Sequence, residues 1–281
     1  MARHRESAEH AAASLARIWF RLGAAAALLG AAGSVVGLVS AASIYGRETA
    51  ILADAATAQD LVNLVLVAPL LVILGWRAHH GHLPAYLVWV GCLAFTVYNY
   101  AIFSFSVHFG PLFLLWVAVL GLSTFALIGG LSTVDMAVVK ERFTDHPVRW
   151  PAWVVITIAA LFTLLWLREI VPDLLAGAPS HSASDWRVPT NPVHVLDLAF
   201  FLPAAATSGI LLLRRHRLGY ATAPSQLTWM ALTCLPILLT PLVEQARSHQ
   251  PGWAVAGPIA AILLASLGAL GSILRGTRSR V

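Results

Sequence analysis

Apolar stretches that approach or exceed the length of a membrane-crossing helix recur along the whole sequence. A helix needs roughly 20 residues to cross a hydrocarbon core of about 30 Å. We identify eight such stretches, at 22–45, 61–76, 83–107, 111–134, 150–167, 193–213, 226–243 and 252–274. Charged residues make up 11% of the chain, against about 25% in soluble domains. The sequence therefore predicts an all-α, polytopic membrane helix bundle with eight transmembrane helices.

The basic residues are divided unequally between the two sides of this predicted bundle. With both termini on one side, that side holds 14 of the 18 lysines and arginines, including Arg3, Arg5, Arg278 and Arg280. Cytoplasmic loops of membrane proteins carry such an excess. We expect a multi-pass protein of the bacterial inner membrane with both termini in the cytoplasm. Its net charge of +5 then reflects membrane orientation, and we expect contact with membrane lipids and no nucleic-acid partner.

Two predicted spans resemble each other and point to an internal repeat. "QDLVNLVLVAPLLVILGWR" (59–77) and "LDLAFFLPAAATSGILLLR" (196–214) each place Asp-Leu at the start, a proline further along, and an arginine 17 positions after the aspartate. The aspartates, Asp60 and Asp197, are 137 residues apart. This spacing predicts two parallel four-helix halves in one membrane domain, residues 1–140 and 141–281. The alternative, that unrelated apolar helices share these end residues, stays open.

The two aspartates differ in how well helix capping explains them. Thr57 as an N-cap would place Asp60 at the third helical position, where a carboxylate suits the exposed amides and the helix dipole. Asn191 followed by Pro192 makes a good helix start, which places Asp197 at the sixth helical position, beyond those amides. An ionisable group inside a membrane span indicates function unless it is paired. Capping and function both remain possible for each residue, and function is favoured for Asp197.

Polar residues at the same predicted depth suggest a binding site around these carboxylates. His194 precedes Asp197 by three positions and Asn63 follows Asp60 by three, so each aspartate has a potential partner on its own helix. Tyr98, Asn99 and His108 lie toward the outer end of the third span. We expect these seven residues to form an outward-facing polar pocket between the halves, which binds an unidentified small molecule.

Motifs for several kinds of chemistry are missing from the sequence. It contains no nucleotide-binding loop, GxSxG, HExxH or CxxC pattern. The histidines of "HHGH" (79–82) have no neighbouring cysteine or carboxylate at ligand spacing, so we interpret them as a solvated basic turn. No metal and no cofactor is predicted. Cys92 and Cys234 both fall inside spans and are expected to be packing residues.

The strings "QDLVNLVLVAPLL", "VYNYAIFSFSVHFGPLFLLWVAVLGLSTFALI" and "NPVHVLDLAFFLPAAATSGILLLRR" resemble those of an uncharacterised family of multi-pass bacterial inner-membrane proteins. The resemblance covers roughly spans 2 to 7. It implies that the outer segments are the distinctive parts of the family, and it implies no activity, ligand or catalytic residue.

Three functions are compatible with these features. Paired carboxylates and a half-repeat favour transport of a small solute, with proton coupling through Asp60 and Asp197. A pocket confined to one side favours a membrane-embedded enzyme acting on a lipid or lipophilic substrate at the outer leaflet, although no metal or nucleophile motif supports it. A non-catalytic partner or sensor subunit is the third possibility.

Overall fold

The computed structural model describes residues 2–143 and 148–277, with side chains from Arg17 onward. Within these residues the fold is all-helical, without a β-strand. Arg278 and Arg280 lie outside the described residues, as do the side chains of Arg3 and Arg5.

Eight helical segments are long and apolar enough to span a membrane, which confirms the predicted polytopic bundle. The first is Arg17–Val39 of α1 (Ala2–Val39), and the second is α3 (Ala50–Val62), the π-helix η1 (Asn63–Val67) and α4 (Ala68–His79). The third to fifth are α5 (Leu83–Ser106), α6 (Phe113–Ser132) and α8 (Arg149–Ala176). The last three are α10 (Pro192–Leu196) with π-helix η2 (Asp197–Phe201) and α11 (Leu202–Leu213); α12 (Arg217–Ala246); and 3-10 helix η3 (Trp253–Val255) with α13 (Ala256–Arg275). Short helices α2 (Ala41–Tyr45), α7 (Met136–Glu141) and α9 (His181–Trp186) lie between them.

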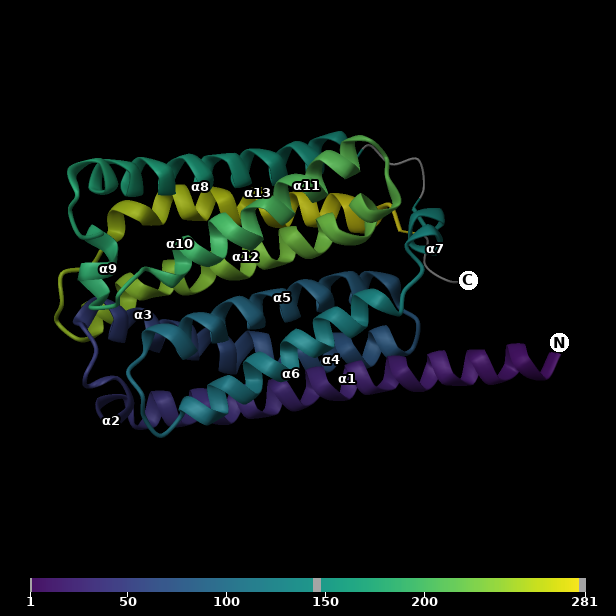
Figure 1. The fold of residues 1–281 in the computed structure, drawn as a ribbon, viewed down its shortest axis with the longest axis horizontal. Helices are drawn as coiled ribbons and strands as arrows, with labels where there is room; N and C mark the ends of the chain where they lie inside the picture. The colour runs from purple at the N-terminus through teal and green to yellow at the C-terminus, as the bar shows by residue number, and fades with distance from the viewer. Residues whose placement is uncertain (1, 144–147, 278–281) are drawn as a thin grey trace.

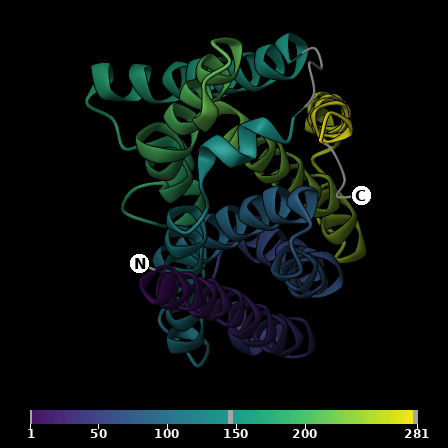
Figure 2. The ribbon, with the colours of Figure 1, turned by 90° about the vertical axis from the view of Figure 1, so that its right-hand side faces the viewer.

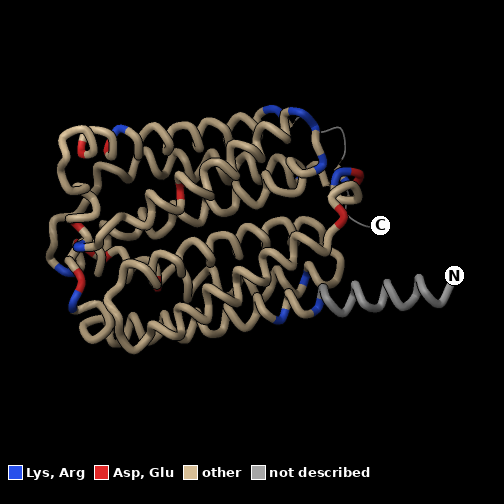
Figure 3. Tube along the Cα trace, in the orientation of Figure 1, with Lys and Arg blue, Asp and Glu red and all other residues tan. Residues whose placement is uncertain are grey.

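The start of α1 and the end of α13 lie at the same end of the bundle as α7, whereas α2 and α9 lie at the opposite end (Figure 1). We call these the terminal end and the distal end. Lysines and arginines gather at the terminal end, and acidic residues are more frequent at the distal end (Figure 3).

The helices form two groups that repeat the same order of packing. In the first group α1 packs on α4 and α6, while α5 packs on α4 and α6. In the second, α8 packs on α11 and α13, while α12 packs on α11 and α13. The groups meet where α5 packs on α12 (Figure 1), and a view from the terminal end shows both around this contact (Figure 2). The parallel arrangement of two four-helix halves is therefore visible in the packing; the division at 140/141 stays a prediction.

The structure changes the register of the repeat. Helices η1 and η2, α4 and α11, and the starts of α5 and α12 each lie 134 residues apart. The turns between them also agree: Gly81 and Arg215 have φ of 83° and 51°, and His82 and His216 are the next residues, both N-caps. The predicted spacing of 137 is thus wrong by about one helical turn. Asp197 corresponds to Asn63, and Asp60 corresponds to His194.

The predicted start of the second span is also wrong. Residues 46–60 are mostly helix, because α3 begins after Thr49, whose side chain accepts the Leu52 amide at 3.4 Å. Thr57 is not an N-cap; its hydroxyl donates to the Ala53 carbonyl at 2.7 Å inside the helix. Asp60 lies near the C-terminal end of α3, so capping does not explain it. Asn191 is an N-cap as predicted, and it accepts the Val193 amide at 2.9 Å.

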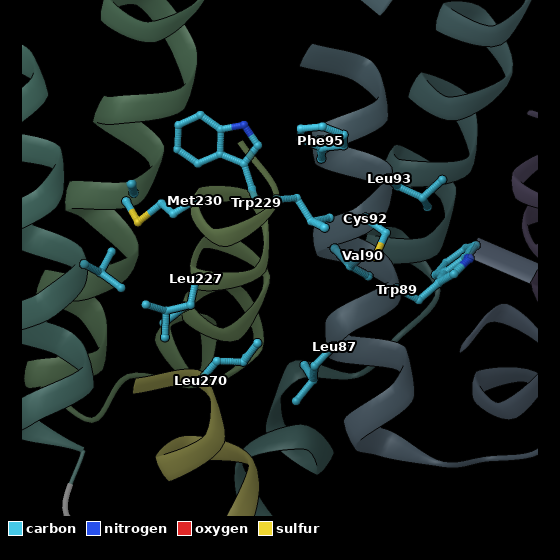
Figure 4. Close-up of a cluster of buried hydrophobic side chains, with 14 of the residues drawn as sticks. Leu87, Trp89, Val90, Cys92, Leu93, Phe95, Leu227, Trp229, Met230 and Leu270 are labelled. Atoms are coloured by element: carbon cyan, nitrogen blue, oxygen red, sulfur yellow. The ribbon is translucent and has the colours of Figure 1, made fainter. Parts of the chain in front are cut away.

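Buried side chains fill the contact between α5 and α12 and close the middle of the bundle (Figure 4). Leu87 and Leu227 are fully buried in this core, as is Leu93 on the side of α5 that faces away from α12 (Figure 4). Gly91 allows the helices to approach closely, because an added Cβ would meet Thr228 and the Ser225 carbonyl. Ser225 also donates a hydrogen bond to the Leu87 carbonyl at 2.9 Å. This contact fixes the two halves against each other.

Candidate functional site

A cavity of about 460 Å³ lies between the two halves in the distal half of the bundle. Its walls come from α3 and α5 of the first half and from α8 to α13 of the second, including the π-helix η2 and the 3-10 helix η3. Most lining side chains are apolar or aromatic, and the polar ones are Gln59, Tyr98, Asn99, Trp166, Trp186, Asn191, Asp197, Trp229, Thr233 and Thr240. The site is therefore an apolar cavity with a few polar groups, of the kind that binds small molecules.

Asp197 is the carboxylate of this cavity, and one of its oxygens is unpaired. The side chain is 5% exposed. Its Oδ2 accepts a hydrogen bond from the indole Nε1 of Trp166 at 2.7 Å, and the phenol of Tyr98 lies close by. Its Oδ1 has no hydrogen-bond partner among the described residues. The described lining of the cavity includes no lysine, arginine or histidine.

A π-helix places Asp197 at this wall, and a proline follows directly after it. The Leu202 amide donates to the Asp197 carbonyl, five residues earlier, and Pro203 follows. Proline has no N–H, and its ring clashes with the carbonyl four residues earlier in a regular α-helix. An extra residue in the turn relieves that clash. In the first half, Ala68 bonds to Asn63 in the same way and Pro69 follows.

Asn99 supplies a second unpaired polar group in the cavity. It lies on α5, is 3% exposed, and its Nδ2 has no hydrogen-bond partner among the described residues. An unpaired amide in an apolar environment costs about 1–3 kcal/mol. Asn99 and Asp197 thus present one unpaired donor and one unpaired acceptor from opposite halves.

Asp60 lies outside this cavity, in the interior of the first half. It is 1% exposed and accepts a hydrogen bond from the Tyr45 hydroxyl at 2.5 Å. Gly37 of α1 packs against the carboxylate, and Ser34 is adjacent. Burial beside this carboxylate raises the pKa of Tyr45 far above its ordinary value. The expected convergence of Asp60 with Asp197 is not seen, because Asp60 faces α1 while Asp197 faces the space between the halves.

Asn63 and the two predicted histidines also lie apart from the cavity lining. Asn63 is buried and accepts a hydrogen bond from the Gln59 amide at 3.1 Å. The His108 ring and backbone amide bind Glu48 at 2.9 and 3.0 Å, at the exposed distal end. The His194 ring packs on Trp166, with a centroid distance of 4.7 Å. Of the seven predicted residues, Tyr98, Asn99 and Asp197 line the cavity.

The hydrogen-bond partner of Asp197 is therefore not the residue that helical spacing suggested. His194 approaches Glu169 instead, with 3.8 Å between Nε2 and Oε1. Trp166, on another helix, holds the carboxylate. The sequence contains no signal for this pairing, since it depends on the way α8 packs on α11.

A buried ion pair at the distal end was also missed by sequence reasoning. Asp54 is 1% exposed and accepts hydrogen bonds from Arg247 at 2.8 Å and His249 at 2.6 Å. The Arg247 guanidinium also donates to Thr57 at 3.0 Å. These contacts join α3 of the first half to the end of α12 in the second.

The histidines of residues 79–82 form a turn at the terminal end, as interpreted from the sequence. His82 accepts the Ala85 amide at 3.1 Å, and the His80 ring bonds to the Trp76 carbonyl at 2.7 Å. Among the described residues, no group of three or more His, Cys, Asp or Glu side chains could hold a metal ion.

Comparisons with protein-family models, with curated proteins and with solved structures find no match to this chain. The functional argument therefore depends on the site itself.

The lining offers a carboxylate, a phenol, amides and one thiol, Cys234. The hydroxyls of Thr233 and Thr240 are engaged with backbone carbonyls. Such a set of groups is suited to binding rather than to nucleophilic catalysis.

Proposed function

We propose that this protein is a membrane transporter that binds a small, largely apolar molecule in the cavity between its two halves, with Asp197 as its proton-binding group. The observation that carries the proposal is the unpaired Asp197 carboxylate on a π-helix in an apolar cavity at the contact of the halves. A carboxylate inside a membrane costs several kcal/mol unless it is paired or protonated, so its presence indicates a function.

The architecture supports transport in two ways. Transporters built from repeats bind their substrates between the repeats, near interrupted helices, and here both halves carry a π-helix at the equivalent position. Helix α12, which contacts the first half, contains Pro224, Pro236 and Pro241. Prolines inside a helix permit it to bend. A rocking motion of one half against the other would require such a bend.

The packed middle of the bundle favours a second candidate, a ligand-binding sensor or partner subunit. Leu87 and Gly91 of α5 pack against Ser225 and Thr228 of α12, toward the terminal end from the cavity. Transport needs this contact to part, whereas ligand sensing does not. The enzyme alternative fits less well because the described lining offers no nucleophile with an adjacent base.

We further propose that the protein resides in a bacterial inner membrane with the terminal end in the cytoplasm. The described residues of the terminal end include the basic residues Arg17, Arg21, Arg77, Lys140, Arg142, Arg149, Arg214, Arg215, Arg217 and Arg275. The distal end has Arg47, Arg168, Arg187 and Arg247. This bias is what the positive-inside rule requires of such an orientation.

Transport can be tested with three poorly permeant aromatic probes: 4-phenylbutyl-trimethylammonium, 4-phenylbutyl sulfonate and phenyl glucoside. Purified protein is reconstituted into liposomes with an acidic lumen, and uptake of each probe is measured. We expect at least one probe to enter faster than in protein-free liposomes, and Asp197→Asn to abolish the dependence on the pH gradient.

Asp60→Asn is the matched control, because Asp60 is an equally buried carboxylate outside the cavity. It should leave uptake and its pH dependence in place. Binding of a probe without uptake would overturn transport in favour of the sensor candidate. Loss of uptake in both variants alike would show that Asp197 has no particular role.

A further inference from the structure

We propose that the ligand of the cavity carries an ammonium group on an apolar body, and that this group pairs with Oδ1 of Asp197. This ligand class rests on the proposed function in one respect, namely that the same cavity is the binding site. The transport proposal leaves the chemical class of the ligand open.

The charge balance of the cavity is the first argument. Asp197 is buried, and the described lining contributes no basic side chain to neutralise it. The indole of Trp166 orients the carboxylate through Oδ2 but carries no charge. A bound anion would be repelled, and a neutral apolar molecule would leave the charge uncompensated. A cation satisfies the site, and a proton is its natural competitor.

The aromatic walls are the second argument. Tyr98, Phe103, Phe162, Trp166, Trp186 and Trp229 all line the cavity. The faces of such rings attract ammonium groups, most strongly where water is excluded. Tyr98 and Phe201 are held in place by edge contacts and stacking with Trp229, at centroid distances of 5.6 and 4.9 Å. The remaining wall, including Ile158, Ile259 and Ile262, can accommodate a hydrocarbon body.

Asn99 requires a second polar atom on the ligand, one that accepts a hydrogen bond. Its unpaired Nδ2 lines the same cavity and can donate a hydrogen bond. A hydroxyl, ether or carbonyl oxygen near the ammonium group would accept it. The ligand class is therefore an amphiphilic amine with a nearby acceptor oxygen.

Protons should compete with the ligand for Asp197. The titratable groups around it are Tyr98 on α5, His194 on α10, Glu169 on α8 and Cys234 on α12. Protonation of Asp197 removes the charge that holds the ammonium group. Affinity for the amine should consequently fall as the pH is lowered, while affinity for an uncharged isostere should not.

The native cysteines provide the assay. Cys234 lines the cavity, whereas Cys92 is buried in the core outside its lining. In a Cys92→Ala background, N-ethylmaleimide labelling of Cys234 is measured by mass spectrometry against increasing 4-phenylbutylamine or 4-phenylbutan-1-ol. These probes have nearly the same shape and differ in charge. We expect the amine to protect Cys234 at concentrations at least about tenfold lower than the alcohol.

Two carboxylate variants connect this preference to Asp197. Asp197→Asn should reduce the preference for the amine to less than about threefold, and Asp60→Asn should leave it unchanged. Equal protection by amine and alcohol in the unmodified cavity would overturn the ammonium inference while leaving a lipophile-binding function intact. Protection by neither probe would overturn both.

Two further measurements keep the result decisive. If Asp197→Asn prevents folding, the unsubstituted Asp197 can be titrated instead. The concentrations of amine and of alcohol that protect Cys234 are then compared from pH 5 to 8, and a constant ratio between them would contradict the inference. If Cys234 does not react, quenching of tryptophan fluorescence by the 4-(4-bromophenyl) analogues of both probes gives the same comparison, because Trp166, Trp186 and Trp229 line the cavity.

The ammonium group can belong to a free amine or to a lipid headgroup. Protein in phosphatidylglycerol vesicles, whose headgroup carries no ammonium group, with and without phosphatidylethanolamine, distinguishes the two. Protection of Cys234 by phosphatidylethanolamine in the absence of added amine would identify the lipid as the occupant. Protection that requires added amine would identify the free compound.

Discussion

Three buried aspartates in this bundle illustrate how differently a carboxylate can be accommodated. Asp54 is neutralised by Arg247 and His249, and Asp60 receives a short hydrogen bond from Tyr45. Asp197 receives one from Trp166 and keeps an oxygen without a described partner. Because the first two are satisfied by the protein, they are explained by stability. Asp197 is the residue that retains capacity for a ligand.

Removal of the cation at Asp54 should destabilise the protein. Arg247→Gln leaves a buried carboxylate with a reduced partner set, at a cost of about 3 kcal/mol. The melting temperature in detergent, followed by intrinsic fluorescence, should fall by several degrees. Arg168→Gln is the control, since Arg168 is an exposed distal arginine. Equal melting temperatures for the two variants would contradict a stabilising role for the ion pair.

Removal of the hydroxyl at Tyr45 should change both stability and its dependence on alkaline pH. Tyr45→Phe deprives Asp60 of a hydrogen bond, at a cost of about 1–3 kcal/mol near neutral pH. Burial raises the pKa of Tyr45, so the unfolded chain releases this proton first as the pH passes about 10. Unfolding is then favoured, and the normal protein should lose stability above that pH more steeply than Tyr45→Phe. If the melting temperatures of the two proteins changed in parallel from pH 8 to 11, Tyr45 would not be buried.

At the scale of elements, the sequence predicts helices well and their register less well. Asn191 and Pro192 predict the start of α10 correctly, because helix capping is an interaction between residues that are close in sequence. The start of α3 was missed because Glu48, Asp54 and Asp60 resemble a polar loop. Asp54 is tolerated inside that helix through Arg247, 193 residues away. A contact between residues so far apart in sequence gives no recognisable pattern in the residues around either of them.

The same limit applies to the repeat and to the candidate site. The prolines Pro69 and Pro203 are visible in the sequence and lie 134 residues apart, as do the π-helices that precede them. An alignment that gave them priority over the aspartates would have found the register. Two features of the site depend on how each helix is rotated about its axis in the bundle: the contact of Trp166 with Asp197, and the separation of Asp60 from Asp197. This rotation cannot be predicted from spans that are apolar on every side, because neither their charges nor their periodicity distinguish one face from another.

The contact between α5 and α12 should tolerate no added side-chain volume. In Gly91→Ala the new methyl group meets Thr228 and the Ser225 carbonyl, the latter at 2.6 Å from the added carbon. Overpacking of this kind costs about 1–3 kcal/mol. The melting temperature should fall, whereas Gly121→Ala, with no atom within 4 Å of its added carbon, should leave it unchanged or slightly raised. A larger fall for the Gly121 variant would show that the halves do not meet as described.

At the scale of the whole molecule, the two halves share a fold but differ in their chemistry. Asp60 and Asn63 in one half occupy the positions of His194 and Asp197 in the other. The first pair is absorbed into the interior of its own half, and the second supplies the carboxylate of the cavity. The repeat therefore supplies the scaffold, and divergence between the halves produces one asymmetric site.

The orientation of this scaffold can be tested in bacterial cells that express the protein. A variant free of native cysteine, with Cys92→Ala and Cys234→Ala, receives one new cysteine at an exposed position. Ala178→Cys lies at the distal end, and His80→Cys lies at the terminal end. Because basic residues concentrate at the terminal end, we expect an impermeant maleimide added to intact cells to label position 178 and not position 80. Both should be labelled after the membrane is permeabilised, which controls for reactivity. Labelling of position 80 in intact cells would place the basic end outside and the cavity toward the cytoplasm.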